Sequence, residues 1–146
     1  MNVFFVCTAN SCRSQMAEAW ARHLFPADWS VSSGGLLTYR ITGKTRAVMG
    51  EVGLDMAGQA TQPIDDFDLD SFDLIVTLSE EAARFLPALQ VPGRHVPLPM
   101  DDPMSAEGDG ETVRAAFRKG RDHIRQIVEG IVAGSIVPGI GGADPR

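Results

Sequence analysis

The sequence contains little of what marks a secreted, membrane-bound or nucleic-acid-binding protein. Only two of its 146 residues are cysteine, and Cys7 and Cys12 lie too close together to close a stabilising loop, so a secreted disulfide scaffold is excluded. No uncharged apolar run reaches the length of about 18 residues that a spanning helix needs. The net charge of −6 lacks the basic excess of a nucleic-acid-binding surface. We therefore expect a protein of the reducing cytoplasm that binds neither nucleic acid nor membrane.

What the sequence does contain predicts one α/β domain. Short apolar runs alternate with amphipathic segments of helical period, which predicts a mainly parallel four-stranded sheet with helices on both faces, a single three-layer domain. Gly34 and Gly35 are expected to form a turn after the second strand. The expected strands cover residues 3–6, 30–33, 74–78 and 95–98. The expected helices cover residues 14–25, 42–52 (with Val48, Met49 and Val52 inward), 80–86 after an N-cap at Ser79, and 112–132.

The segment from Cys7 to Ser14 has the residues needed to bind a tetrahedral oxyanion. Ligands of parallel sheets bind beyond the carboxyl ends of the strands, and backbone amides that lead into a helix form an anion-binding nest. Arg13 can add a bidentate guanidinium fork, and a cysteine at such a positive site is favoured as a thiolate nucleophile. A lone cysteine after a buried strand is more often a core residue. The C-x5-R-S spacing before an amphipathic helix favours the catalytic interpretation.

The other residues of this segment are expected to support the nucleophile. The hydroxyl of Ser14 or Ser11 can donate to the thiolate, and the Asn10 amide can hold the backbone of the loop itself. The predicted oxyanion-binding loop consists of Thr8, Ala9, Asn10, Ser11, Cys12, Arg13 and Ser14.

Residues 4–18, FFVCTANSCRSQMAE, resemble the opening of the low-molecular-weight protein tyrosine phosphatase superfamily, which includes the thioredoxin-coupled arsenate reductases. Residues 10–18 of this segment, NSCRSQMAE, are similar to the arsenate-reductase branch, as is Trp20, which follows two residues later. The resemblance implies a phosphatase-like fold with one catalytic domain over residues 1–134. Residues 135–146 are expected to form a flexible tail, because they are rich in glycine and proline. The similarity covers residues 2–132 and continues through residues 33–34, 47–55, 73–78, 101–103 and 117–124.

The resemblance also implies roles for individual residues. Cys7 matches the nucleophile of the superfamily, Arg13 its oxyanion-binding arginine, and Asp102 the general acid that protonates the leaving oxygen. Asn10 and Ser14 match residues that shape the loop and stabilise the thiolate. An Asp-Pro pair alone would indicate only a turn, but a carboxyl group on the long polar loop 99–110 can approach a bound anion.

The sequence departs from both branches of the superfamily. The thioredoxin-coupled reductases carry two further cysteines, whereas Ser79 and the region of Phe85 and Leu86 stand at those positions here, so their internal disulfide transfer cannot operate. The phosphatases usually place aromatic residues after Asp-Pro, where this chain has Met104 and Ser105. Neither branch is matched completely.

A resident metal or cofactor is not expected. Some related reductases bind potassium beside the loop through positions that match Asn10, Glu18 and Ser33, but Gln62 stands where the completing aspartate is expected. The three histidines have no ligand spacing with each other or with the cysteines, which argues against zinc. A reductase of this kind would instead require an external thiol reductant.

Three functions remain open from the sequence. The first is reduction of arsenate to arsenite by Cys7, with an external thiol, a thiol-redox partner, or Cys12 as the candidate resolving thiol. The second is hydrolysis of aryl phosphates or phosphotyrosine through a phospho-cysteine intermediate. The third is a non-catalytic oxyanion or redox sensor.

Two charged stretches are interpreted as surface. The acidic segment 65–73 is expected to be a solvated face held to the core by Phe67, Leu69 and Phe72. Four arginines at helical spacing are expected to form an exposed ion-pair face: Arg114, Arg118, Arg121 and Arg125.

Overall fold

Four parallel strands form the middle layer of the protein. The computed structural model describes residues 1–138, and its sheet has the order β2-β1-β3-β4 with every neighbouring pair parallel. The four-stranded parallel sheet predicted from the sequence is therefore confirmed. The strands are β1 (Asn2–Cys7), β2 (Ser30–Gly35), β3 (Leu74–Thr77) and β4 (His95–Pro97).

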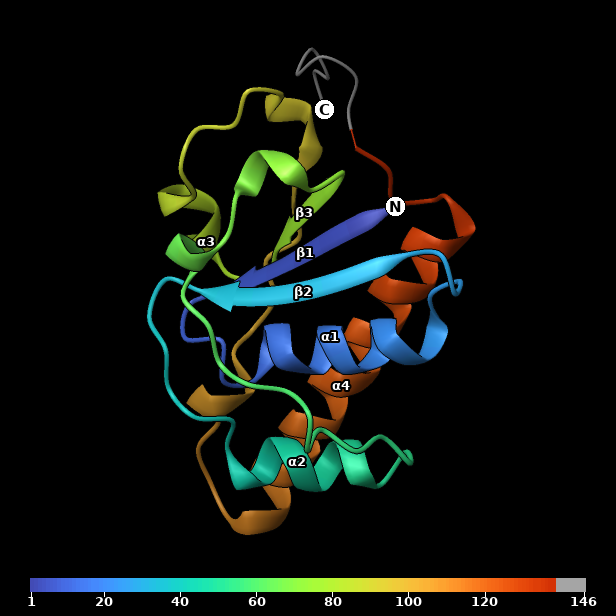
Figure 1. Cartoon of the computed structure of the whole chain (residues 1–146). Helices are drawn as coiled ribbons and strands as arrows, with labels where there is room; N and C mark the ends of the chain where they lie inside the picture. The colour runs from blue at the N-terminus through green and yellow to red at the C-terminus, as the bar shows by residue number, and fades with distance from the viewer. Residues whose placement is uncertain (139–146) are drawn as a thin grey trace.

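Helices cover both faces of this sheet (Figure 1). On one face α1 packs against α4 and α2 packs against α4, whereas α3 lies on the other face. The side chains of β1 alternate between the two faces: Val3 and Phe5 join the core of the first face, and Phe4 and Val6 join the core of the second. The helices are α1 (Arg13–Leu24), α2 (Gly43–Gly50), α3 (Glu80–Phe85) and α4 (Gly110–Ala133).

The predicted turn at Gly34 and Gly35 is wrong, because both glycines belong to β2. They pair with Val6 and Cys7 of β1. A Cβ atom at Gly34 would lie 2.8 Å from Cζ of Phe4, and one at Gly35 would lie 2.8 Å from the Asn10 amide nitrogen. The two glycines thus allow the close approach of neighbouring segments within a strand rather than a reversal of the chain.

The start of α3 and the end of α2 are explained by the residues beside them. Ser79 caps α3 as predicted, since its side chain accepts a hydrogen bond from the Ala82 amide. α2 ends before Val52, which is 36% exposed, so the prediction that Val52 faces the core is wrong. Gly53, with φ of 80°, follows Val52, and this left-handed residue ends the helical path before Leu54 and Met56 pack against the first core.

The acidic segment is attached to the sheet as expected. Phe72 is buried, Phe67 and Leu69 pack against the second core, and the Phe4 and Phe72 rings stack with centroids 4.5 Å apart.

The end of the chain is described only as far as residue 138. The Ser135 and Ile136 amides donate to the Gly130 carbonyl, and Ile136 packs against the first core. Residues 139–146, which make up most of the predicted tail, lie outside the described residues, so the domain boundary at residue 134 stays a prediction. Among the helices of residues 1–138, none has both the length and the apolar character needed to cross a membrane.

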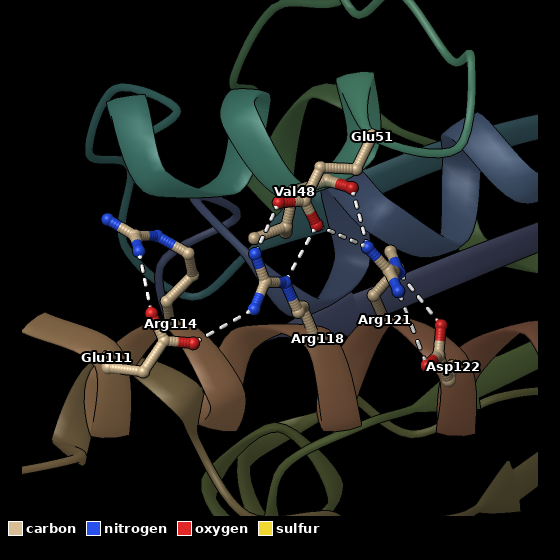
Figure 2. A network of polar contacts seen from close by, with 7 residues as sticks. All are labelled: Val48, Glu51, Glu111, Arg114, Arg118, Arg121 and Asp122. Atoms are coloured by element: carbon tan, nitrogen blue, oxygen red, sulfur yellow. Dashed lines mark hydrogen bonds and ion pairs between the residues drawn. The ribbon is translucent and has the colours of Figure 1, made fainter.

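A group of ion pairs joins α2 to α4 (Figure 2). Glu51 accepts from Arg118 at 2.9 and 2.7 Å and from Arg121 at 2.9 Å. The hydrogen bonds from Arg118, together with those from Arg121, lower the pKa of Glu51 to about 2. Arg121 also donates to the Val48 carbonyl at 2.9 Å.

Arg121 is only 8% exposed, so the expectation of an exposed arginine face is wrong for this residue. The cause is the packing of α2 on α4, which covers Arg121 and offers it a carbonyl of the last helical turn, where carbonyls lack intrahelical partners. Arg125 agrees with the expectation, since it is half exposed and pairs with Glu129; its guanidinium also lies 5.0 Å from the Trp20 ring centroid.

We expect Arg121→Ala to lower the free energy of unfolding by about 2 kcal/mol, because it removes a buried hydrogen bond and leaves the Val48 carbonyl without its guanidinium partner. Urea denaturation measures this change. Arg114→Ala is the matched control: it removes only an exposed pair with Glu111 and should cost at most about 0.5 kcal/mol. Equal effects of the two substitutions would contradict the structural role of Arg121.

Candidate active site

The loop between β1 and α1 is held by the segment that follows β2. The carbonyls of Cys7, Thr8 and Ala9 accept hydrogen bonds from the amides of Leu36, Leu37 and Tyr39, at 3.4, 2.9 and 3.1 Å respectively. These bonds give three successive carbonyl groups of the chain a hydrogen-bond partner in the segment 36–39. The loop therefore has a fixed backbone at the carboxyl end of the sheet, where the sequence predicted the site to lie.

Cys7 and Ser14 lie in contact. The Cys7 Sγ and Ser14 Oγ atoms are 2.8 Å apart, and both residues are almost completely buried, with exposed fractions of 2% and 0%. Ser11, the alternative hydroxyl donor, instead contacts the Met104 sulfur at 3.4 Å. Of the two serines, Ser14 is thus the one that the structure brings to the predicted nucleophile, Cys7.

Asn10 has different partners from those expected. Its side-chain nitrogen donates to Ser14 Oγ at 2.7 Å and to Ser33 Oγ at 3.0 Å, and its oxygen accepts from Gln15 and from the Gln62 amide. The prediction that it holds the backbone of its own loop is wrong. Asn10 is fully buried among α1, β2 and the segment before residue 63, so its polar atoms take partners from those elements.

Arg13 and Asp102 lie together at the mouth of the loop. The guanidinium donates to the Met100 carbonyl at 3.0 Å, and its second terminal nitrogen is 3.6 Å from Asp102 Oδ2. Asp102 also caps the short turn Pro103–Ser105 by accepting from the Met104 amide. The structure therefore brings together the arginine and the carboxylate predicted from distant parts of the sequence.

An open cavity of about 370 Å³ lies beside Arg13. Four carboxylate residues line it, so the guanidinium lies in acidic surroundings. Its lining residues are Arg13, Glu80, Glu81, Pro99, Met100, Asp101 and Asp102.

Cys12 lies in the same loop but contacts Thr45 of α2. It is 2% exposed within the first core, and burial raises the pKa of its thiol to about 12 despite a hydrogen bond with Thr45 of α2. At neutral pH it is a thiol, the unreactive form of cysteine. Both cysteines are free.

Sequence reasoning missed two contacts of the loop. Thr8 Oγ1 donates to Ser79 Oγ at 3.0 Å and to Glu81 Oε1 at 3.3 Å, which ties the loop to the start of α3. Leu37 and Tyr39, which follow β2 beside the loop, are 53% and 61% exposed. The sequence identified Ser79 as a helix cap and as a position where related reductases carry a cysteine, but not as a partner of Thr8, and no motif marks the segment 36–39.

Taken together, the loop, a buried cysteine, an arginine and a carboxyl group form a site that can hold a tetrahedral oxyanion next to a sulfur nucleophile. A family model described as low molecular weight phosphotyrosine protein phosphatase matches residues 2–134. The chain belongs to this family. Membership confirms the predicted resemblance and indicates a cysteine-dependent enzyme.

Within the wider family, the chain is similar to proteins named arsenate reductase. It is 39% identical to the one from Halalkalibacterium halodurans, over 87% of this chain and 91% of that protein. It is 38% identical to the one from Bacillus subtilis, over 84% and 88% of the two chains. A solved arsenate reductase in the phosphate binding state covers 91% of this chain and 97% of its own, with 32% identity and a TM-score of 0.72.

The fold is also shared by phosphatases of this family. A tyrosine phosphatase from T. tengcongensis has a TM-score of 0.75 at 22% identity, covering 92% of this chain and 99% of its own. At this level of identity the similarity concerns the fold alone, and it confirms the predicted phosphatase-like architecture.

We expect Gly35→Ala to distort the loop, because the new methyl group would meet the Leu37 carbonyl and the Asn10 and Ala9 backbone. The free energy of unfolding should fall by about 2 kcal/mol or more, and added phosphate should no longer raise the melting temperature. Gly43→Ala is the control, since a methyl group at that position would meet no other segment within 4 Å. Equal stabilisation of both variants by phosphate would contradict the role of Gly35.

Proposed function

We propose that the protein is an arsenate reductase in which Cys7 is the nucleophile and a thiol from outside the chain is the reductant. The observation that carries the proposal is the Cys7–Ser14 contact of 2.8 Å in the loop that leads into Arg13, within a chain 39% identical to an arsenate reductase. Arsenate is a tetrahedral oxyanion of the kind that this loop is suited to bind. Phosphate or a phosphomonoester has the same geometry and would occupy the same site.

In the first step the Cys7 thiolate attacks the arsenic atom of bound arsenate. A sulfur–arsenic bond forms and one arsenic–oxygen bond breaks. Arg13 and the loop amides stabilise the charge on the remaining oxygens, and Asp102 gives its proton to the departing oxygen, which leaves as water. Ser14 donates to Cys7 and stabilises the thiolate before the attack.

In the second step an external thiolate attacks the Cys7 sulfur. The sulfur–arsenic bond breaks, and its electron pair stays with arsenic, which leaves as arsenite. Cys7 then carries a mixed disulfide, and a second external thiol attacks that disulfide and restores free Cys7. The net reaction converts arsenate and two thiols into arsenite, one disulfide and water.

We infer that this thiol comes from outside the chain, because the chain has no second cysteine suited to the step. There are two in the whole sequence, and Cys12 is buried with a pKa of about 12. Ser79 caps α3 at the point where related reductases carry a cysteine. This chemistry requires a partner that supplies the thiol, either a small-molecule thiol or a thiol-redox protein. We propose that the reaction takes place in the cytoplasm, a reducing compartment.

Phosphatase activity is the second candidate, favoured by the same shortage of thiols. Hydrolysis of a phospho-cysteine intermediate requires water rather than a second cysteine, so the site as built suffices. We expect hydrolysis of aryl phosphates as a side activity of the reductase, using the same Cys7 and Asp102.

To test the proposal, arsenite release with defined thiol donors is compared with aryl-phosphate hydrolysis on one preparation. Cys7→Ser should lower both activities about a thousandfold or more, because both begin with its sulfur. Asp102→Asn should lower hydrolysis of substrates with poor leaving groups by about a hundredfold. Hydrolysis without arsenite release would support the phosphatase instead, and tight oxyanion binding with neither activity would support a sensor.

A second test concerns the resolving thiol. We expect Cys12→Ser to keep arsenite release within about twofold of the wild type, since the buried Cys12 thiol takes no part in an external resolution step. The measurement is turnover with several thiol donors, after thermal unfolding has shown that the variant is folded. Loss of turnover with every donor in a folded variant would identify Cys12 as the resolving thiol.

A further inference from the structure

Glu18 is a buried charged group that the proposed reaction does not use. It lies on α1 with 6% of its surface exposed. One of its oxygens accepts from Ser33 Oγ at 2.6 Å, and the other accepts from Arg22 Nε and Nη2 at 2.9 and 2.7 Å. Arg22 is the outer partner, with 58% of its side chain exposed. The ion pair therefore connects the protein surface to the buried Ser33.

A continuous series of hydrogen bonds leads from this ion pair to Cys7. An ionised carboxylate only accepts hydrogen bonds, so Ser33 uses its single proton on Glu18 and can only accept from Asn10. The Asn10 oxygen accepts from the Gln62 amide at 2.9 Å, which fixes the orientation of the carboxamide because a backbone amide only donates. Its nitrogen then supplies one proton to Ser33 and the other to Ser14.

The direction of the last bond depends on the form of Cys7. Ser14 Oγ accepts from Asn10 and keeps its own proton, and a Cys7 thiolate, 2.8 Å away, can only accept. With Cys7 as a thiolate, each bond from Glu18 to Cys7 therefore has one donor and one acceptor. The arrangement stabilises the thiolate form of Cys7, since a hydrogen bond to an ionised group is stronger than one to a neutral group.

The same residues do not fit a potassium site like the one that some related reductases have. Both Glu18 oxygens, the Asn10 oxygen and the Ser33 hydroxyl already have hydrogen-bond partners. The Arg22 guanidinium supplies the positive charge that a buried carboxylate needs. Within residues 1–138, no group of three or more His, Cys, Asp or Glu side chains is arranged to hold a metal.

We propose that the Glu18–Arg22 ion pair is a positioning device for the nucleophile: it replaces a bound cation and, through Ser33, Asn10 and Ser14, holds Cys7 ready as a thiolate. This inference rests on the role proposed above for Cys7. Glu18 and Arg22 are positioning residues, because neither touches the sulfur. A glutamine at position 18 cannot replace the carboxylate, since it offers one oxygen where both Arg22 and Ser33 require an acceptor.

The test is the pH profile of Cys7 alkylation by iodoacetamide, with the modified residue identified by mass spectrometry. We expect Glu18→Gln and Arg22→Gln to move the midpoint of the profile upward by about half a pH unit or more, and Arg22→Lys to restore it. Arg114→Gln is the matched control, because it breaks an exposed arginine–glutamate pair elsewhere on the surface. The other titratable groups near Cys7 are Cys12, Arg13, Asp102 and, through Thr8, Glu81, and every variant keeps them.

A second experiment tests directly whether potassium affects the reactivity of Cys7. The wild-type profile should be the same in potassium chloride and in choline chloride at equal ionic strength, because the guanidinium already provides the charge. A potassium-dependent wild-type profile, or an Arg22→Gln variant that matches the wild type, would overturn the inference. Arg22→Gln keeps the test valid if Glu18→Gln does not fold, since Arg22 is largely exposed. A Cys7 that does not react at any pH would instead contradict the proposed function.

Discussion

The carboxamide of Asn10 is the group on which the geometry of the site depends. It is fully buried and makes four hydrogen bonds, to α1, to β2 and to the backbone at residue 62. Its backbone has φ of 52°, the only positive value at a non-glycine among residues 1–138, in a region where asparagine is better tolerated than most residues. A buried amide left without partners would be costly, so these bonds stabilise the conformation of the loop in which Cys7 and Ser14 are in contact.

The scaffold outside the loop supports this conformation from two sides. β2 contributes Ser33 beneath Asn10, and its final glycines let the next segment approach and bind the carbonyls of the loop. α2 contributes Thr45 to Cys12, and ion pairs between Glu51 and the arginines of α4 hold α2 in place (Figure 2). Residues that are remote from Cys7 therefore support the backbone of the loop.

The sequence was most informative where structure depends on local pattern. The apolar runs predicted the strands, Ser79 was identifiable as a helix cap, and the cysteine–arginine spacing located the loop. It was least informative where structure depends on distant neighbours. Gly34 and Gly35 have the composition of a turn, and only the closeness of Phe4 and Asn10 explains them. Likewise, Asn10 meets Gln62 and Arg121 meets Val48 across long stretches of chain, so neither pairing follows from periodicity.

The four carboxylate residues around the cavity beside Arg13 affect how a substrate arrives. Glu80, Glu81, Asp101 and Asp102 line the approach, and the chain as a whole carries a net charge of −6. A divalent anion that approaches through this cavity therefore meets negative charge before it reaches the loop. Because dissolved salt screens charges over about 8 Å at physiological ionic strength, the encounter rate with such an anion should rise with salt, whereas a cationic co-substrate would be attracted by long-range forces.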